Sequence, residues 1–262
     1  GVDPQGHQRG LVESSVYSGL QLGGVRLGTV VTDHRTPFEE RWGGWYVTGT
    51  HGALRHRGNA LARDPTRGAG LVEAANQNLT TLVRFVDPSD YLTPTSDLIA
   101  LMTLEHQTQM INLFTRAGWE ARIAEHDGLL NETEAAARHR SVDEIVRYML
   151  FADEAPLSDP IQGVSTFTET FSTRGPRDQR GRSLRDFDLR TRLFRYPLSY
   201  MVYSDLFDGL PALRSLAEGG GAADGVVRDG QVEGVRVGHA HASPDAHREG
   251  LELEGRGGIV GH

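Results

Sequence analysis

The longest helical pattern in the chain is TPTSDLIALMTLEHQTQMINLFTRAGWEARIA, residues 93–124. Thr95 or Ser96 is placed to cap this helix, and Asp97 suits the positive potential of a first helical turn. Apolar side chains fall on nearly every side of the cylinder, and they are Leu98, Ile99, Leu101, Met102, Leu104, Met110, Ile111, Leu113 and Phe114. This distribution predicts a helix buried in the core. The fold class is therefore predicted to be mainly α.

A line of polar residues follows one half of the same helix. Spacings of three, four or seven residues place these polar side chains on the same half of the helix. They are Glu105, His106, Gln109, Arg116 and Glu120. A buried carboxylate beside a buried imidazole must be paired, protonated or bound to something. One interpretation is an internal network in which Arg116 pairs with Glu120. The other is a catalytic or ligand site, with His106 or Met110 as a metal or haem ligand and Glu105 as the proton acceptor.

The rest of the chain divides into a body and a tail. Residues 1–212 are predicted to form a single-domain helical body, and its first 60 residues are an extended Gly-rich arm. Residues 213–262 are predicted to be an irregular, disordered tail, because Gly is frequent there and no Phe, Tyr or Trp follows Phe207.

Several shorter elements are predicted within the body. They are two β-like runs at residues 11–17 and 25–32 and four short helices at residues 131–138, 141–150, 165–171 and 199–206. Ser141 and Glu144 have the spacing of a capping box, which predicts that the second of these helices begins there.

Composition excludes several functional classes. The chain has 262 residues and a net charge of −8, which argues against general nucleic-acid binding. All of its 27 basic residues are Arg, and it has no Cys, so lysine Schiff bases, P-loop lysines and thiolate nucleophiles are excluded within these residues. No apolar run approaches the roughly 18 residues of a membrane span, so none is predicted. Serine-hydrolase, nucleotide-binding and zincin motifs are also missing.

A glycine-rich aromatic segment precedes the long helix. It reads ERWGGWYVTGTHG, residues 40–52, and contains Trp42, Trp45 and His51, with His56 four residues beyond it. Glycine lets backbone approach a ligand, and tryptophan supplies an apolar wall. The segment predicts a cofactor wall, with both histidines close enough for one metal. The alternative is an aromatic turn packed on the core, with the histidines bonded to loop carbonyls.

A second candidate for binding is an arginine-rich loop at residues 174–195. Eight Arg stand there against three Asp. The loop is either a solvated face whose arginines pair with acidic residues or a docking surface. In the second case Arg182 and Arg185 would receive haem propionates or an acidic redox partner, because guanidinium groups bind carboxylates in a bidentate manner.

Four sequence blocks carry a resemblance to a known group of proteins. They are TDHRTPFEERWGGWYVTGTHG at residues 32–52, SDL to LEHQ at residues 96–107, GRSLRDFDL at residues 181–189 and YP at residues 196–197. These blocks are similar to blocks of uncharacterised secreted bacterial proteins of a cytochrome c-like family, over roughly residues 1–210. The resemblance implies haem c, attached in those proteins through a C-x-x-C-H motif preceding the segment that matches residue 1. It also implies a periplasmic or secreted location.

Three functions follow as expectations. The first is the body of a haem-associated periplasmic electron-transfer protein, with His51, His56, His106 or Met110 nearest the iron. The second is a non-haem iron or zinc oxidoreductase or hydrolase, with the three histidines as metal ligands and Glu105 as base. The third is a noncatalytic binding module, in which every polar group named above is structural.

Overall fold

The computed structural model describes residues 13–17, 26–59, 74–127, 132–210, 231–232 and 235–236. Its helices and strands are β1 (Glu13–Tyr17), β2 (Arg26–Val31), α1 (Leu98–Asp127), α2 (Glu132–Met149), α3 (Phe167–Thr173), α4 (Asp205–Asp208), β3 (Gln231–Val232) and β4 (Val235–Arg236). Helices dominate over two small antiparallel strand pairs, β1–β2 and β3–β4, so the mainly α prediction is confirmed. The predicted tail lies outside the described residues, apart from β3 and β4.

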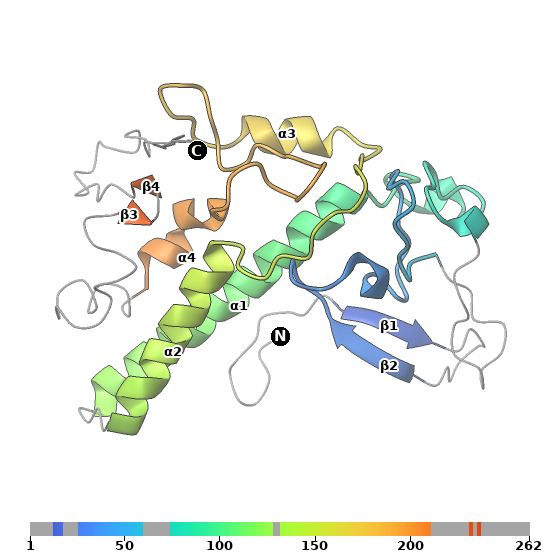
Figure 1. Cartoon of the computed structure of the whole chain (residues 1–262). Helices are drawn as coiled ribbons and strands as arrows, with labels where there is room; N and C mark the ends of the chain where they lie inside the picture. Colours follow the sequence, from blue (N-terminus) through green and yellow to red (C-terminus); the bar gives the residue numbers. More distant parts are fainter. Residues whose placement is uncertain are drawn as a thin grey trace, which may run out of the picture.

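Helix α1 runs through the middle of the molecule, and α2 returns beside its second half (Figure 1). Short helices α3 and α4 pack against α1 as well. Short 3-10 turns connect the elements, and they are Phe38–Glu40, Ala74–Asn76, Pro88–Asp90 and Tyr200–Tyr203. Among the described residues, no helix is both long and apolar enough to cross a membrane.

Asp97 begins helix α1, which corrects the predicted cap at Thr95 or Ser96. Its Oδ1 accepts hydrogen bonds from the backbone N–H of Ile99 at 2.8 Å and of Ala100 at 3.3 Å. Its Oδ2 accepts from the backbone N–H groups of residues 164 and 165, both at 2.8 Å. One carboxylate therefore caps the helix and also holds the loop that precedes α3. This double role favours Asp at the cap over a shorter hydroxyl side chain.

Burial of α1 is less complete than its sequence predicted. Leu98, Ile99 and Met110 are fully buried. Leu104, however, is 43% exposed and Trp119 is 53% exposed. The prediction of a helix buried on all sides is therefore wrong for its outer face, which is exposed at Leu104 in the first half of the helix and at Trp119 in the second.

Residues 132–149 form one helix rather than the two short helices predicted. Ser141 does not cap a helix, because its hydroxyl donates to Oε2 of Glu120 on α1 at 2.6 Å. Glu144 pairs with Arg116 of α1 instead of closing a capping box. The predicted pairing of Arg116 with Glu120 also forms, at 3.9 Å. Contacts between α1 and α2 thus replace the local cap that the sequence spacing favoured.

The other short elements lie close to their predicted positions. Strands β1 and β2 pair antiparallel with Glu13 opposite Val31, as the two β-like runs favoured. Helix α3 begins two residues later than predicted. The predicted helix at residues 199–206 is instead a 3-10 turn followed by α4, and the Ser204 hydroxyl between them caps α4.

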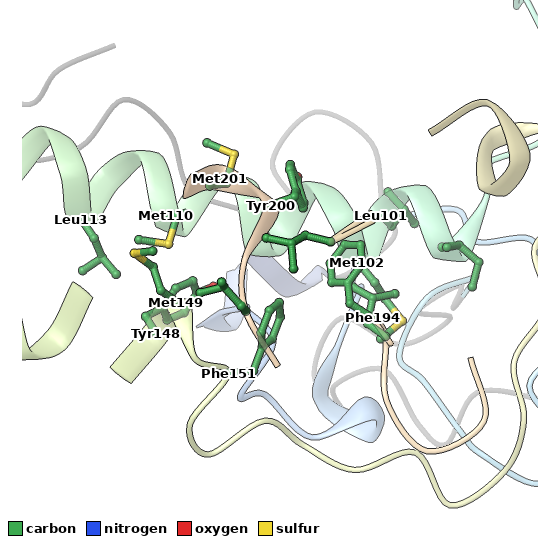
Figure 2. Close-up of a cluster of buried hydrophobic side chains, with 14 of the residues drawn as sticks. Leu101, Met102, Met110, Leu113, Tyr148, Met149, Phe151, Phe194, Tyr200 and Met201 are labelled. Carbon is green, nitrogen blue, oxygen red and sulfur yellow. The ribbon is translucent and has the colours of Figure 1, made fainter. Parts of the chain in front are cut away.

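The main core lies where α1, the end of α2 and the loop after α2 meet. Figure 2 shows its centre, where Met110, Met149 and Met201 lie together beside aromatic rings. The labelled rings are Tyr148, Phe151, Phe194 and Tyr200. All four methionines of the chain are buried, so they serve as apolar packing residues here.

Candidate functional site

A buried ion pair joins the N-terminal arm to the first third of α1. Nη1 of Arg41 donates to Oε2 of Glu105 at 2.9 Å, and the two side chains are 2% and 0% exposed. The remaining guanidinium donors bond the carbonyls of Thr36, at 2.7 and 2.9 Å, and of His34, at 3.2 Å. Burial raises the pKa of Glu105 to about 6, although Arg41 acts in the opposite direction. Glu105 is therefore ionised at neutral pH and is held by the arm.

Beside this pair, a chain of hydrogen bonds links His34, His106 and Ser199. Nδ1 of His34 lies 3.0 Å from Nδ1 of His106, and Nε2 of His106 lies 2.7 Å from the Ser199 hydroxyl. Burial lowers the pKa of His106 well below its usual value. Burial and the nearby Arg35 guanidinium lower the pKa of His34 to about 3. Both imidazoles are therefore neutral at physiological pH.

The tautomers of the two rings are coupled. A hydrogen bond between two Nδ1 atoms needs one proton, so one ring donates while the other accepts. Either arrangement uses both nitrogens of His106 and leaves Nε2 of His34 at the end of the chain. That atom is buried and has no hydrogen-bond partner among the described residues, although the Ala152 backbone lies close enough to raise the pKa of the ring slightly.

The Ser199–His106 pair has the atoms of a nucleophile and its base, but its surroundings are those of a core. Ser199 is 0% exposed, and its hydroxyl also accepts from the backbone N–H of Met201 at 3.2 Å, where it caps the 3-10 turn. His106 stacks on Phe151 at 4.5 Å and on Tyr148 at 5.2 Å between ring centroids. Aromatic rings thus enclose the pair, and a substrate carbonyl would need to displace them.

The two histidines of the aromatic segment lie together, 4.9 Å apart between ring centroids. Nδ1 of His51 donates to the carbonyl of Leu54 at 2.9 Å, and its Nε2 accepts from the backbone N–H of Asn78 at 3.1 Å. Both ring nitrogens of His51 are therefore used. Burial lowers the pKa of His56 to about 3. Its Nδ1 is buried and has no hydrogen-bond partner among the described residues, although the Gly58 backbone acts to raise the pKa of the ring.

The predicted residues form two groups rather than one ligand set. The Phe38 ring lies 5.5 Å from the His51 ring and 5.0 Å from the Trp42 ring, between ring centroids. Trp42 is next in the chain to Arg41, which donates to Glu105 of the other group. The two groups are therefore parts of one continuous buried region, separated by aromatic rings. Among the described residues, no cluster of three or more His, Asp or Glu is arranged to hold a metal ion.

The two tryptophans have different environments. Trp42 is 1% exposed and meets the His56 ring edge-on at 5.5 Å. Trp45 is 36% exposed, on the outer side of the same turn. Trp42 is therefore a core residue, and Trp45 is available to solvent.

Met110 and the arginine loop also find partners inside the fold. Met110 is 0% exposed, within the apolar cluster of Figure 2. Arg182 pairs with Asp178 at 2.7 Å. Arg185 lies over the rings of Phe171 and Tyr200, at 4.8 and 5.1 Å from their centroids. Two further arginines of this loop form ion pairs, Arg177 with Asp186 and Arg192 with Glu154. Internal pairing thus uses much of the loop's positive charge.

An open cavity lies on the outer side of Trp45. We call it the aromatic pocket; it encloses about 300 Å³ and is lined by Gly44, Trp45, Tyr46, Leu82, Val86, Tyr91, Thr93, Thr95 and Ser96. Among the described residues that line it, none is charged. A second cavity, of about 220 Å³, lies between the arm and α2 and is lined mostly by arginines and carboxylates.

Sequence reasoning missed several of these residues. His34, Arg41 and Ser199 were not singled out, although the first two stand in the block at residues 32–52 that carries the resemblance. In the aromatic pocket only Trp45 was anticipated. Tyr91 could have been found because it is an aromatic residue in an irregular polar segment, where an exposed side chain is expected rather than a buried one.

Comparisons of the chain with family profiles, with curated proteins and with solved structures find no match. The resemblance to cytochrome c-like proteins therefore stays a prediction, as do the haem, the redox partner and the periplasmic location.

Proposed function

We propose that the described body is a noncatalytic binding module and that the aromatic pocket is its recognition site. The observation that carries the proposal is the contrast between this pocket and the buried polar groups. The pocket is open, and the described residues that line it include three aromatic side chains and no charged one. The catalytic candidates are enclosed: Glu105 bonds Arg41, and His106 bonds His34 and Ser199. A small cavity with aromatic walls and a few polar groups is the usual form of a ligand site.

Several buried ionisable residues support this proposal because they have structural partners, whereas Nδ1 of His56 has none among the described residues. Arg41 and Glu105 join the arm to α1, and His106 joins the arm to Ser199. His51 joins two loops through Leu54 and Asn78. Catalysis would need at least one of these groups to face a substrate. Their placement instead gives the fold a rigid arrangement of arm, helix and loops.

The walls of the aromatic pocket are tied together by backbone hydrogen bonds. The N–H of Thr48 donates to the carbonyl of Ser96 at 2.7 Å, and the N–H of Leu82 donates to the carbonyl of Pro94 at 2.8 Å. The carbonyl of Trp45 accepts from the N–H of Asn59 at 2.9 Å. Three separate segments are thus held at fixed positions before any ligand arrives. Such preorganisation reduces the entropy lost on binding.

A fragment screen monitored by thermal shift tests the proposal. Fragments that stabilise the protein should lose their effect in Trp45→Ala and keep it in Trp119→Ala, which removes an exposed tryptophan of α1 far along the sequence from the pocket. Stabilisation that survives Trp45→Ala but disappears in His106→Asn would contradict the proposal and favour a site at the buried histidines.

A second candidate is the haem-associated electron-transfer protein expected from the resemblance. The observation that favours it is Nε2 of His34, a buried nitrogen on a neutral imidazole without a partner among the described residues. In the tautomer in which His34 donates from Nδ1, its Nε2 carries the lone pair that an iron ligand requires, and a bound haem would supply one-electron chemistry. His51 and His106 fit such a role less well because their ring nitrogens are used. Met110 is enclosed by apolar neighbours.

Haem and metal analysis of the native product tests this second candidate. A Soret band that shifts in His34→Gln and not in His51→Gln would support it. A native product that contains neither haem nor metal and is fully stable would count against both the haem and the iron or zinc interpretations.

A further inference from the structure

We infer that the aromatic pocket binds a neutral saccharide ring. The inference rests on the proposed function and adds the chemical class of the ligand. It is carried by the composition and the arrangement of the pocket, which combines exposed aromatic faces with a row of hydroxyl side chains.

The aromatic part of the pocket comes from two segments. Trp45 is 36% exposed, Tyr46 is 39% exposed and Tyr91 is 58% exposed, so each side chain is partly accessible to solvent. The Tyr46 ring also packs against Phe85, at 5.6 Å between ring centroids. The face of an aromatic ring is electron-rich. It therefore attracts the slightly positive C–H groups that a pyranose ring presents on one side.

The hydroxyl part of the pocket comes from the segment that leads into α1. Thr93, Thr95 and Ser96 line it, and the hydroxyls of Thr93 and Thr95 lie 2.7 Å apart. Each hydroxyl has one donor and two acceptor positions, so this pair retains capacity for a ligand. A purely apolar ligand would remove these groups from water without replacing their hydrogen bonds, which is unfavourable.

The charge and the size of the pocket narrow the choice further. Among the described residues that line it, no Arg, His, Asp or Glu is present, so phosphates, carboxylates and ammonium groups would lose hydration without gaining a partner. Its volume of about 300 Å³ lies at the lower end for ligand sites. One sugar ring or the terminal unit of a glycan suits it. An extended proline-rich peptide needs a longer aromatic groove.

Saturation-transfer NMR with three defined glycosides tests the inference. The probes are the methyl β-glycosides of glucose, galactose and N-acetylglucosamine, each at about 10 mM, which is ten times a millimolar Kd. At least one should receive saturation on its ring C–H protons. Trp45→Ala and Tyr91→Ala should each weaken binding about tenfold. Thr95→Val, which keeps the shape and removes a hydroxyl, should weaken it as well, and Trp119→Ala should not.

The outcomes separate this inference from the proposed function. Absence of saturation transfer to all three glycosides, while fragments still bind in a Trp45-dependent way, would overturn the saccharide and leave the binding module standing. If neither the glycosides nor any fragment binds in a Trp45-dependent way, both the saccharide assignment and the proposed binding module are overturned. Binding of a proline-rich peptide in place of the glycosides, lost in Tyr91→Ala, would also overturn the saccharide assignment.

Discussion

Two regions of this molecule use polar and aromatic residues in opposite ways. In the centre, Arg41, Glu105 and His106 lie among aromatic rings and are at most 2% exposed. In the aromatic pocket, Trp45 and Tyr91 present their rings to solvent beside uncharged hydroxyls. The comparison teaches that ionisable side chains do not by themselves mark a functional site. Their hydrogen-bond partners and their access to solvent decide whether they act on the fold or on a ligand.

The largest effect should come from removing Arg41. Arg41→Ala leaves the Glu105 carboxylate buried without its cation, which should lower the free energy of unfolding by about 3–5 kcal/mol, measured by urea denaturation. Arg147→Ala breaks an exposed ion pair with Asp153 and is the matched control. The Arg147→Ala variant should lose less than about 1 kcal/mol of unfolding free energy. Equal losses in the two variants would contradict the structural role of the central pair.

Acid should destabilise the protein through its buried histidines. The pKa values of His34, His56 and His106 are lowered in the folded state, so the unfolded chain takes up protons first as pH falls below about 6.5. From about pH 7.5 to 5.5, His34 and His56 should each lower the free energy of unfolding by about 1.4 kcal/mol, and His106 and His51 act in the same direction. Glu105, with its raised pKa, works in the opposite direction by about 1 kcal/mol.

The net fall is therefore at least about 2 kcal/mol, seen as a lower urea midpoint at the lower pH. His56→Gln should reduce the pH dependence by about one proton. A stability that is constant or rises on acidification would show that these histidines are not held neutral.

Loss of the Asp97 carboxylate should have an intermediate effect. Asp97→Ala removes the cap of α1 and the acceptor for the loop before α3, so the free energy of unfolding should fall by about 2 kcal/mol. Asp87→Ala removes the exposed cap of a short 3-10 turn and should have a clearly smaller effect. Similar denaturation midpoints for both variants would argue that α1 does not depend on this cap.

The smallest effect on stability is expected in the pocket. Trp45→Ala removes a side chain that is 36% exposed and should lower the free energy of unfolding by less than the loss of a fully buried tryptophan does. Trp42→Ala, three residues earlier, leaves a cavity in the core and should lower it by about 3–5 kcal/mol. Urea denaturation of the two variants checks this contrast. A large loss in Trp45→Ala would mean that Trp45 is a packing residue.

Local signals allowed part of the fold to be predicted. Helix α1 follows from apolar spacing that is sustained over eight turns, and β1–β2 follow from short runs of β-forming residues. The cap of α1 was ambiguous because Thr95, Ser96 and Asp97 are all good capping residues. Long-range contacts determine which of the three residues caps the helix, since Asp97 also accepts hydrogen bonds from the backbone of residues 164 and 165. A long-range contact likewise replaces the predicted cap at Ser141, because the Ser141 hydroxyl donates to Glu120 of α1.

The central network could not be predicted from local patterns. Arg41 and Glu105 are 64 residues apart, His34 and His106 are 72 apart, and His106 and Ser199 are 93 apart. No sequence period links such positions. The aromatic pocket likewise draws on three segments, which are joined only when backbone bonds bring them together. The sequence thus indicated buried polar residues on α1 but not the partners that determine what these residues do.

Mapping of ligand-induced NMR shifts across the described body tests the central claim most directly. In a titration with the best fragment or glycoside, the account predicts the largest shifts at the indole N–H of Trp45 and at Tyr91, with the ring resonances of His106 unchanged. Largest shifts at His106 and Ser199, with Trp45 unaffected, would contradict it.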